Sequence, residues 1–125
     1  RILVTAIWLK ENEPEIRKHF KGPIESIEDY ELEKISALST SNQVLGVFRK
    51  MKANLIEVKG NITLALDTIQ DPGNLGTIIR IADWFGVPAI ICSENCADLY
   101  NPTVVQSTRG SIGRVEVMYT NVIQW

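Results

Sequence analysis

The sequence has few of the residues that stabilise small secreted domains or bind metals. Its 125 residues include 2 cysteines and 1 histidine, too few for a disulfide framework or for the paired ligands of a zinc site. We therefore expect reduced thiols, a cytoplasmic protein and no metal site. No apolar run approaches the ~18 residues of a membrane-spanning helix, so we expect no membrane span. The 45% of hydrophobic and 22% of charged residues are typical of a folded globular protein and exclude disorder.

Positive charge is scarce in the second half of the sequence. Residues 61–125 contain 3 Lys or Arg against 6 Asp or Glu, whereas residues 1–60 contain 10 against 9. The net charge of −2 argues against a broad basic surface for nucleic acid. A short basic strip remains, which is either a solvated linker or a phosphate-binding segment; it consists of Arg49, Lys50 and Lys52.

Both ends of the sequence resemble the cut ends of a longer protein. Arg1 leads directly into an apolar stretch, without an initiator methionine or a polar lead-in. At the other end, Thr120 and Asn121 resemble a helix N-cap, but the chain stops about one turn later, which is too short for a stable helix. We therefore expect a fragment of a larger protein.

The first half of the sequence predicts an α/β arrangement. Residues 2–9 are rich in β-branched and aromatic side chains and predict a strand. A helix is expected to follow with Pro14 in its first turn, and a second helix over residues 29–38. Residues 43–48 predict another strand.

The second half predicts strands and helices in alternation, which favours a parallel sheet. Short apolar runs predict strands at residues 62–66, 87–92 and 113–118. A helix with one apolar stripe is expected between the first two strands, and another helix over residues 102–107.

These patterns divide the chain into two parts joined by a linker. We assign residues 1–52 to the later part of one domain, residues 53–60 to the linker, and residues 61–125 to the first part of a second domain. The second domain is expected to be of doubly wound, Rossmann-like type, in which ligands bind beyond the carboxyl ends of the strands. A dinucleotide site is not favoured, because residues 73–76 do not match G-x-G-x-x-G.

One helix face carries the side chains best suited to chemistry. It follows the loop of residues 67–74, at the edge of the sheet where ligands are expected. Because seven residues make nearly two turns, Gly73, Thr77, Arg80 and Trp84 share a face distinct from the apolar stripe. Arg80 is either an ordinary surface arginine or a side chain that reaches back toward the loop, where Asn74 would hold it.

Other residues give weaker signals. His19 lies beside two lysines and is best interpreted as a solvated side chain. Arg109 and Arg114 flank a Gly-Ser-Ile-Gly stretch and are candidates for RNA phosphate contacts, although Arg109 also suits a helix end. The tryptophans are too far apart in sequence to predict a base-stacking platform: Trp8, Trp84 and Trp125.

Residues 71–86 carry a motif, DPGNLGTIIRIADWFG. It resembles the first motif of the SpoU (TrmH-like) RNA ribose methyltransferases, N-x-G-x-x-x-R-x-A-x-x-F-G. Residues 101–111 resemble the segment that follows in this family. Residues 1–52 resemble, less specifically, the ribosomal-protein-like RNA-binding domain that often precedes it. The motif matches at each specified position: Asn74, Gly76, Arg80, Ala82, Phe85 and Gly86.

The resemblance implies a SPOUT (α/β knot) fold and a methyl transfer. Such enzymes transfer the methyl group of S-adenosylmethionine to a ribose 2′-hydroxyl in tRNA or rRNA, usually as homodimers that share the site. The motif arginine is the proposed activator and the motif asparagine its positioner, which correspond to Arg80 and Asn74. Because arginine stays protonated, we expect Arg80 to stabilise the developing alkoxide and to bind phosphate, and we leave the base open.

The chain departs from the family pattern by lacking the later motifs. Those motifs supply the acidic residue, the glycine-rich loop and the threaded segment of the knotted cofactor pocket, so we expect the cofactor-binding residues after Trp125. We expect this fragment alone not to bind S-adenosylmethionine and the full-length protein to be competent. The alternative is a non-catalytic RNA-binding or ribosome-assembly module of the same fold.

Overall fold

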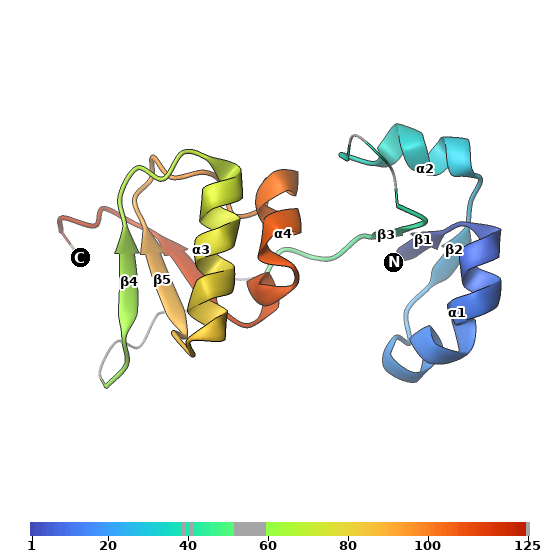
Figure 1. Cartoon of the computed structure of the whole chain (residues 1–125), viewed down its shortest axis with the longest axis horizontal. Helices are drawn as coiled ribbons and strands as arrows, with labels where there is room; N and C mark the ends of the chain where they lie inside the picture. The colour runs from blue at the N-terminus through green and yellow to red at the C-terminus, as the bar shows by residue number, and fades with distance from the viewer. Residues whose placement is uncertain (39, 41, 52–59, 125) are drawn as a thin grey trace. The chain divides into compact units, whose positions relative to one another are not determined.

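The computed structural model describes residues 1–38, 40, 42–51 and 60–124. It divides into two compact units, Arg1–Lys50 and Met51–Trp125, which we treat separately (Figure 1). Lys52 and residues 53–59 of the predicted linker lie outside the described residues.

A three-stranded mixed sheet forms the centre of the first unit. β1 (Ile2–Val4) lies between β2 (Ile24–Ser26), which is parallel to it, and β3 (Val44–Gly46), which is antiparallel. α1 (Ala6–His19) connects β1 to β2, and α2 (Asp29–Ile35) follows β2. The buried side chains among its described residues form a short list: Ile2, Val4, Thr5 and Leu32.

The predicted strand over residues 2–9 is wrong beyond Val4. The chain enters α1 at Ala6, because the Thr5 hydroxyl accepts a hydrogen bond from the Trp8 amide at 3.4 Å and caps the helix. Pro14 therefore lies inside α1 rather than in its first turn. A short apolar run suits a strand and a helix alike, and here one capping hydroxyl favours the helix.

α2 and β3 are shorter than predicted, and the sequence pattern did not predict β2. α2 ends at Ile35, where the prediction extended to residue 38, and β3 covers only the middle of residues 43–48. α2 begins with a side-chain contact in which the Glu28 amide donates to the Glu31 carboxylate at 3.0 Å. The predicted α/β class is confirmed, with boundaries moved by a few residues.

A parallel sheet forms the second unit. β4 (Thr63–Leu66), β5 (Ala89–Cys92) and β6 (Glu116–Tyr119) are neighbours in that order, all running in the same direction. α3 (Pro72–Trp84) connects β4 to β5, as predicted. This strand, helix and strand order is the arrangement expected for a doubly wound domain.

Two helical segments connect β5 to β6. α4 (Pro102–Thr108) corresponds to the predicted helix, and it is followed by a short 3₁₀ helix, η1 (Ser111–Gly113). Because η1 takes up residue 113 and the chain turns at residues 114 and 115, β6 begins at Glu116 instead of at residue 113.

α3 and α4 pack on the same face of the parallel sheet (Figure 1). Their buried side chains form one cluster with those of β5, and each large aliphatic side chain in it contributes roughly 1.5–3 kcal/mol by burial. The cluster places α3 firmly against the sheet; it includes Leu75, Ile79, Ala82, Val104, Ile90 and Cys92.

Gly76 lets α3 and α4 approach each other closely. A Cβ atom at Gly76 would lie 2.5 Å from the Ser107 Cβ and 2.7 Å from the Val104 carbonyl oxygen, which is far inside van der Waals contact. The motif glycine therefore has a packing role. It fixes the end of α4 beside the turn of α3 that carries Arg80, four residues later on the same side.

The described chain ends in a turn that begins after Asn121, where the sequence predicts a helix N-cap. Residues 122–124 turn after Asn121, whose side-chain oxygen accepts a hydrogen bond from the Ile123 amide at 3.1 Å. Across the described ranges, none of the helices has the length and apolar character needed to cross a membrane.

Candidate functional site

The loops that follow β4 and β5 are bonded to each other at the carboxyl edge of the sheet. Thr68 has a left-handed backbone, with φ 56°, and its amide donates to Ser93 Oγ at 2.9 Å. The Ile69 amide donates to Cys96 Sγ at 3.3 Å, and the Ala97 amide donates to the Ile69 carbonyl at 2.8 Å. These bonds fix the edge from which α3 starts.

Two buried cysteines lie at this edge. Burial raises the pKa of the Cys92 thiol to about 12, and the neighbouring Cys96 adds to the shift. Cys92 therefore stays protonated at neutral pH and is a core side chain rather than a nucleophile. Within the described ranges, no three metal-ligating side chains cluster.

Asp71 fixes the start of α3. Its carboxylate accepts a hydrogen bond from the Asn74 amide at 2.7 Å, and Pro72 occupies the first helical position, where no amide donor is needed. The predicted loop of residues 67–74 thus ends at a helix N-cap, and its last residues form the first turn of α3. It places Asn74 in the first turn of α3 with its side chain exposed.

Asn74 and Arg80, the predicted catalytic residues, both lie exposed on α3. Six residues separate them, which is ~9 Å along a helix axis, and the structure shows no hydrogen bond between their side chains. Arg80 forms no ion pair with any residue that the structure describes. Its guanidinium is therefore available to an anionic ligand, while the catalytic roles of both residues stay predictions.

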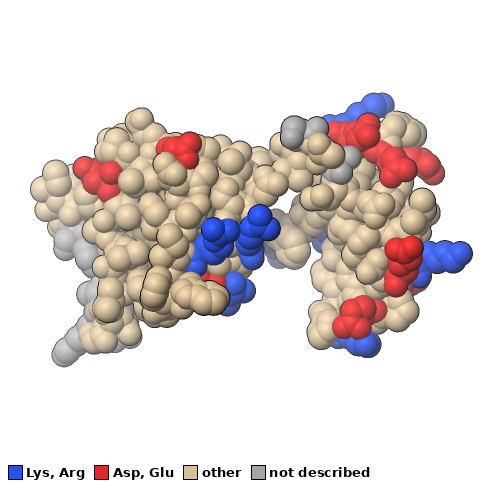
Figure 2. All heavy atoms as spheres, viewed as in Figure 1, with Lys and Arg blue, Asp and Glu red and all other residues tan. Residues whose placement is uncertain are grey.

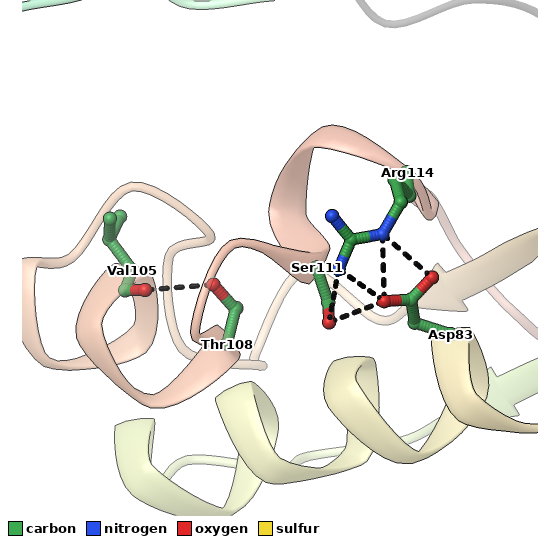
Figure 3. Close-up of polar contacts among 5 residues, drawn as sticks. All are labelled: Asp83, Val105, Thr108, Ser111 and Arg114. Atoms are coloured by element: carbon green, nitrogen blue, oxygen red, sulfur yellow. Dashed lines mark hydrogen bonds and ion pairs between the residues drawn. The ribbon is translucent and has the colours of Figure 1, made fainter. Parts of the chain in front are cut away.

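Arg114, which follows η1, is bound by an acid on α3. Its Nε donates to both carboxylate oxygens of Asp83 at 3.0 and 2.9 Å, and its Nη2 donates to one of them at 2.6 Å. Ser111 Oγ donates to the same oxygen at 2.7 Å (Figure 3). The hydrogen bonds from Arg114, and then from Ser111, hold the pKa of Asp83 below its ordinary value. In return, Asp83 raises the pKa of Arg114.

This ion pair affects the surroundings of Arg80. Asp83 lies three residues after Arg80 on α3, a spacing at which opposite charges on a helix can pair. The Asp83 carboxylate is instead held by Arg114 and Ser111. Arg114 was predicted as an RNA contact, and that role stays a prediction beside the structural one that the ion pair shows.

α4 ends in a left-handed turn that carries Arg109. Arg109 has φ 48° and Gly110 has φ 92°, and Thr108 Oγ1 closes the last turn by donating to the Val105 carbonyl at 2.8 Å (Figure 3). A non-glycine residue in this conformation costs roughly 1–2 kcal/mol. The exposed Arg109 is therefore held by the surrounding structure in a conformation that it would not adopt by itself.

The described cations of the second unit gather on one face. Within the described part of Met51–Trp125, the Lys and Arg residues are Arg80 on α3, Arg109 directly after α4 and Arg114 directly after η1. These three elements contact one another. Figure 2 shows the blue atoms of this unit grouped over these elements. The structure thus brings together two predicted RNA contacts and the predicted catalytic arginine, which the sequence places 29 and 34 positions apart.

The predicted basic strip lies only partly within the described residues. Arg49 and Lys50 are exposed at the end of the first unit, and Lys52 lies outside the described ranges. Their contact with RNA stays a prediction.

The sequence did not indicate a role for Asp83 or Ser111 beside the candidate site. No local pattern links Asp83 to Arg114, which lies 31 residues later, and only the return of the chain through β5 and α4 brings them together. The one available signal was that Asp83 stands one turn from the motif arginine on a helix.

The comparisons with known proteins agree with this geometry. A family model described as the SpoU rRNA Methylase family matches residues 61–125, which is more than half of the chain. The chain belongs to this family. The 23S rRNA (guanosine(2553)-2′-O)-methyltransferase RlmP of Bacillus subtilis is 32% identical over 88 residues, which cover 70% of this chain and 35% of that protein.

Two further members show how much of the family this chain spans. The mitochondrial rRNA methyltransferase 3 of Mus musculus is 30% identical over 118 residues, covering 82% of this chain and 28% of that protein. The SpoU methyltransferase AviRb of Streptomyces viridochromogenes, solved in complex with the cofactor AdoMet, shares the fold with a TM-score of 0.82 at 23% identity. That alignment covers 98% of this chain and 48% of AviRb. The chain therefore spans about half of this solved structure and about a third of the two curated relatives.

Two hydrogen bonds join polar groups at the carboxyl edge of the sheet: Thr68 Oγ1 donates to Asp67 at 3.0 Å, and the Thr68 amide donates to Ser93. These bonds hold the loops after β4 and β5 and do not identify a residue that contacts S-adenosylmethionine. We therefore derive no catalytic step through the cofactor from this chain.

Proposed function

We propose that the whole protein transfers a methyl group from S-adenosylmethionine to a ribose 2′-hydroxyl of rRNA or tRNA. Membership of the SpoU family supports this, as does the Bacillus subtilis relative, whose name specifies 2′-O-methylation of 23S rRNA. The cofactor-binding residues belong, on this proposal, to a segment after Trp125, which is where the order of the family's motifs places them.

The observation that carries the proposal is the exposed guanidinium of Arg80, which forms no ion pair with any described residue. A ribose hydroxyl is a poor nucleophile because its pKa lies far above neutrality, so a fixed positive charge that stabilises the developing alkoxide lowers the barrier. Arg80 stays protonated and is suited to this role. Asp83, the acid one turn away, is held by Arg114, so it does not compete for the Arg80 guanidinium.

The remaining predicted residues act as positioning and binding groups in this proposal. Asn74, in the first turn of α3, positions the Arg80 guanidinium when the long arginine side chain reaches back toward the start of the helix. The RNA backbone is contacted by the arginines grouped near α3 and by the basic strip, and phosphate contacts of this kind position RNA without reading its sequence. These residues are Arg109, Arg114, Arg49, Lys50 and Lys52.

The test is the chemical identity of the product. The whole protein, incubated with methyl-labelled S-adenosylmethionine and ribosomal or transfer RNA, is expected to place the label on a ribose. Alkaline hydrolysis then leaves a labelled dinucleotide, because a 2′-O-methyl group blocks cleavage of the adjacent bond. Label on a base would show methyl transfer to a different acceptor and would contradict the ribose assignment. RNA binding without any label would instead favour the non-catalytic RNA-binding or assembly module.

The basic strip is tested through the salt dependence of RNA binding. Replacing Lys50 and Lys52 together by Gln is expected to weaken binding and to reduce the slope of log K against log[salt] by about 1.4 to 1.8, since each lost phosphate contact removes about 0.7 to 0.9. Lys18→Gln, on α1, is the matched control for removing a lysine elsewhere. An unchanged slope in the double variant would identify the strip as a linker only.

The assembly and location of the protein complete the proposal. A homodimer in which the α3 face lies near the partner is expected from the family resemblance, and sedimentation equilibrium of the whole protein measures it. A cytoplasmic location is expected from the scarcity of cysteine, whereas the mouse relative is named as mitochondrial; fractionation of cells distinguishes the two.

A further inference from the structure

α3 carries one basic and one acidic side chain, Arg80 and Asp83. They are three residues apart, a spacing at which opposite charges on a helix pair with each other. Both follow Gly76 on the side of α3 that approaches α4, where a Cβ atom at Gly76 would meet Ser107. This placement by itself favours an ion pair that would occupy the predicted catalytic guanidinium.

The structure shows a different partner for Asp83. Arg114 donates to it through two nitrogen atoms, from Nε to both carboxylate oxygens and from Nη2 to one of them at 2.6 Å (Figure 3). The buried Ser111 donates to the same oxygen at 2.7 Å, and its Oγ accepts from Arg114 Nη2 at 3.4 Å. Guanidinium and carboxylate groups form some of the strongest hydrogen bonds in proteins, so the Asp83 carboxylate is held beside η1.

The residues that hold Asp83 are themselves fixed. η1 contacts α3, and the amides of Arg114 and Val115 both donate to the Ser111 carbonyl, at 2.9 and 3.1 Å. Gly110 precedes this turn with φ 92°, a left-handed conformation that costs glycine little. The hydrogen bonds from Arg114, and then from Ser111, keep the pKa of Asp83 below its ordinary value. At neutral pH this carboxylate therefore carries its full negative charge.

We infer that Arg114 is a positioning residue for the methyl transfer: by binding the Asp83 carboxylate, it leaves the Arg80 guanidinium to the substrate oxygen. Ser111 assists by donating to the same carboxylate. This inference rests on the proposed function and adds to it a residue that acts through another side chain. The contact joins two segments of one chain and requires no open surface on α3.

Loss of Arg114 would set the charge of Asp83 against that of Arg80. A released carboxylate one helical turn away pairs with the guanidinium or cancels part of its field at the developing alkoxide. Removal of a whole transition-state donor lowers kcat about 100- to 1,000-fold. Because only part of the charge is cancelled, Arg114→Gln is expected to lower kcat less, by about 3- to 30-fold at saturating RNA.

The test is a rescue experiment in the whole protein. Arg114→Gln releases the Asp83 carboxylate, and the double variant with Asp83→Asn removes the released charge. The kcat for ribose methylation is expected to fall in the single variant and to return to within about threefold of the parent in the double variant, where Arg80 keeps its full charge. Arg17→Gln is the matched control, because it breaks an exposed ion pair with Glu13 on α1 and is expected to leave kcat unchanged.

The KM for RNA separates this role from direct RNA binding. A phosphate contact made by Arg114 changes KM equally in the single and the double variant, because both lack the guanidinium. The positioning role changes kcat, and only in the single variant. A fall in kcat that the double variant does not restore would overturn the inference, since a brace between α3 and η1 is lost in both variants. Circular dichroism and sedimentation check that each variant folds and assembles as the parent does.

A measurement without turnover separates this inference from the proposed function. In the NMR spectrum of the whole protein, the Nε–H signal of Arg80 is identified by its loss in Arg80→Lys. Pairing with Asp83 is expected to shift this signal in Arg114→Gln, and the double variant is expected to return it to the parent position.

The two measurements together decide between the proposals. A parent that transfers no methyl group, with an Arg80 signal that shifts in Arg114→Gln, loses the enzymatic proposal and retains the charge arrangement. A parent that methylates ribose, with kcat and the Arg80 signal both unchanged in Arg114→Gln, retains the function and loses the positioning role.

Discussion

α1 and α3 are helices of nearly equal length that are stabilised in different ways. α1 has 14 residues, all of them described, and none is buried, whereas α3 has 13 residues and buries four. α1 depends on a capping hydroxyl and on exposed ion pairs such as Arg17 with Glu13 at 3.6 Å, each worth roughly 0.2–0.5 kcal/mol. α3 depends on packing against the sheet and α4, which is worth several times more.

This difference decides where the chain can hold a site. A catalytic side chain must be kept within a fraction of an ångström of its working position, and a helix fixed by a packed core does this better than one held by local contacts. Arg80 lies on α3 between the core residue Ile79 and the Asp83 ion pair. We therefore expect changes in the α3 core to affect both stability and activity, and changes in α1 to affect neither strongly.

Ile79→Ala is the largest expected effect on stability. Ile79 is fully buried, so its truncation is expected to lower the free energy of unfolding by about 2–5 kcal/mol. Ile16→Ala, on α1, removes the same atoms from a partly exposed position and is expected to cost less than half as much. Urea unfolding followed by circular dichroism measures both, and equal losses would show that α1 is held by packing as α3 is.

Gly76→Ala tests the contact between α3 and α4. The added methyl group would meet Ser107 and the Val104 carbonyl, so we expect a loss of about 1–3 kcal/mol in the free energy of unfolding.

Gly73→Ala is the matched control on the same helix. Its methyl group would meet only the Asp71 side chain, at 3.2 Å, and alanine favours a helix over glycine by up to about 1 kcal/mol. We expect opposite signs for the two substitutions in the same unfolding measurement. A stabilising Gly76→Ala would mean that the two helices are not in close contact.

Cys92 is expected to make the protein sensitive to alkali. The folded pKa of about 12 lies above the thiol's ordinary value of 9.0. The stabilisation from the neutral thiol is therefore complete below pH 9.0 and is lost as the pH rises toward 12, at up to about 1.4 kcal/mol per pH unit.

Cys92→Val is expected to remove this part of the pH dependence. The free energy of unfolding is still expected to fall with rising pH in this variant, because burial also raises the pKa of Tyr119 to about 12. Urea unfolding of parent and variant at several alkaline pH values measures the difference, and an identical slope in the two proteins would exclude Cys92 as its source.

Asp83→Asn is expected to have the smallest effect on stability, because the Arg114 side chain in the ion pair is exposed and the Asp83 side chain is only partly buried. The pKa of Asp83 is lowered from 3.8, so the pair stabilises the folded state above that pH and its contribution is lost as the pH falls through the folded value. The difference in the free energy of unfolding between parent and variant is thus expected to disappear at acid pH. Arg114→Gln is expected to lower the free energy of unfolding at neutral pH by as much as Asp83→Asn does, and the double variant is expected to lower it no further. Additive losses would mean that the two side chains act independently.

The sequence predicted the second unit better than the first for a physical reason. The order of β4, α3 and β5 follows from apolar runs and an apolar stripe, patterns that burial imposes on a sequence. In α1 no residue is buried, so its sequence carries no strong stripe, and the Thr5 cap decided the structure of residues that otherwise predict a strand. Element type was therefore predictable where packing is strong.

The candidate site was predictable only in part. The motif indicated Asn74 and Arg80, because fixed spacings within one helix are visible in a sequence. The spacing also placed Trp84 on a face distinct from the apolar stripe, and Trp84 is exposed. The bond between Asp83 and Arg114 joins residues 31 positions apart, and it cannot be read from local spacing.

The role of Arg80 in catalysis can be measured in the whole protein with its RNA substrate. Arg80→Ala is expected to lower kcat by about two to four orders of magnitude, since it removes a charge that stabilises the alkoxide, while the affinity for S-adenosylmethionine stays nearly unchanged. Arg80→Lys keeps the charge without the planar guanidinium, and its kcat is expected to lie between those of the parent and Arg80→Ala. If Arg80→Ala turns over as fast as the parent, Arg80 has no part in the reaction.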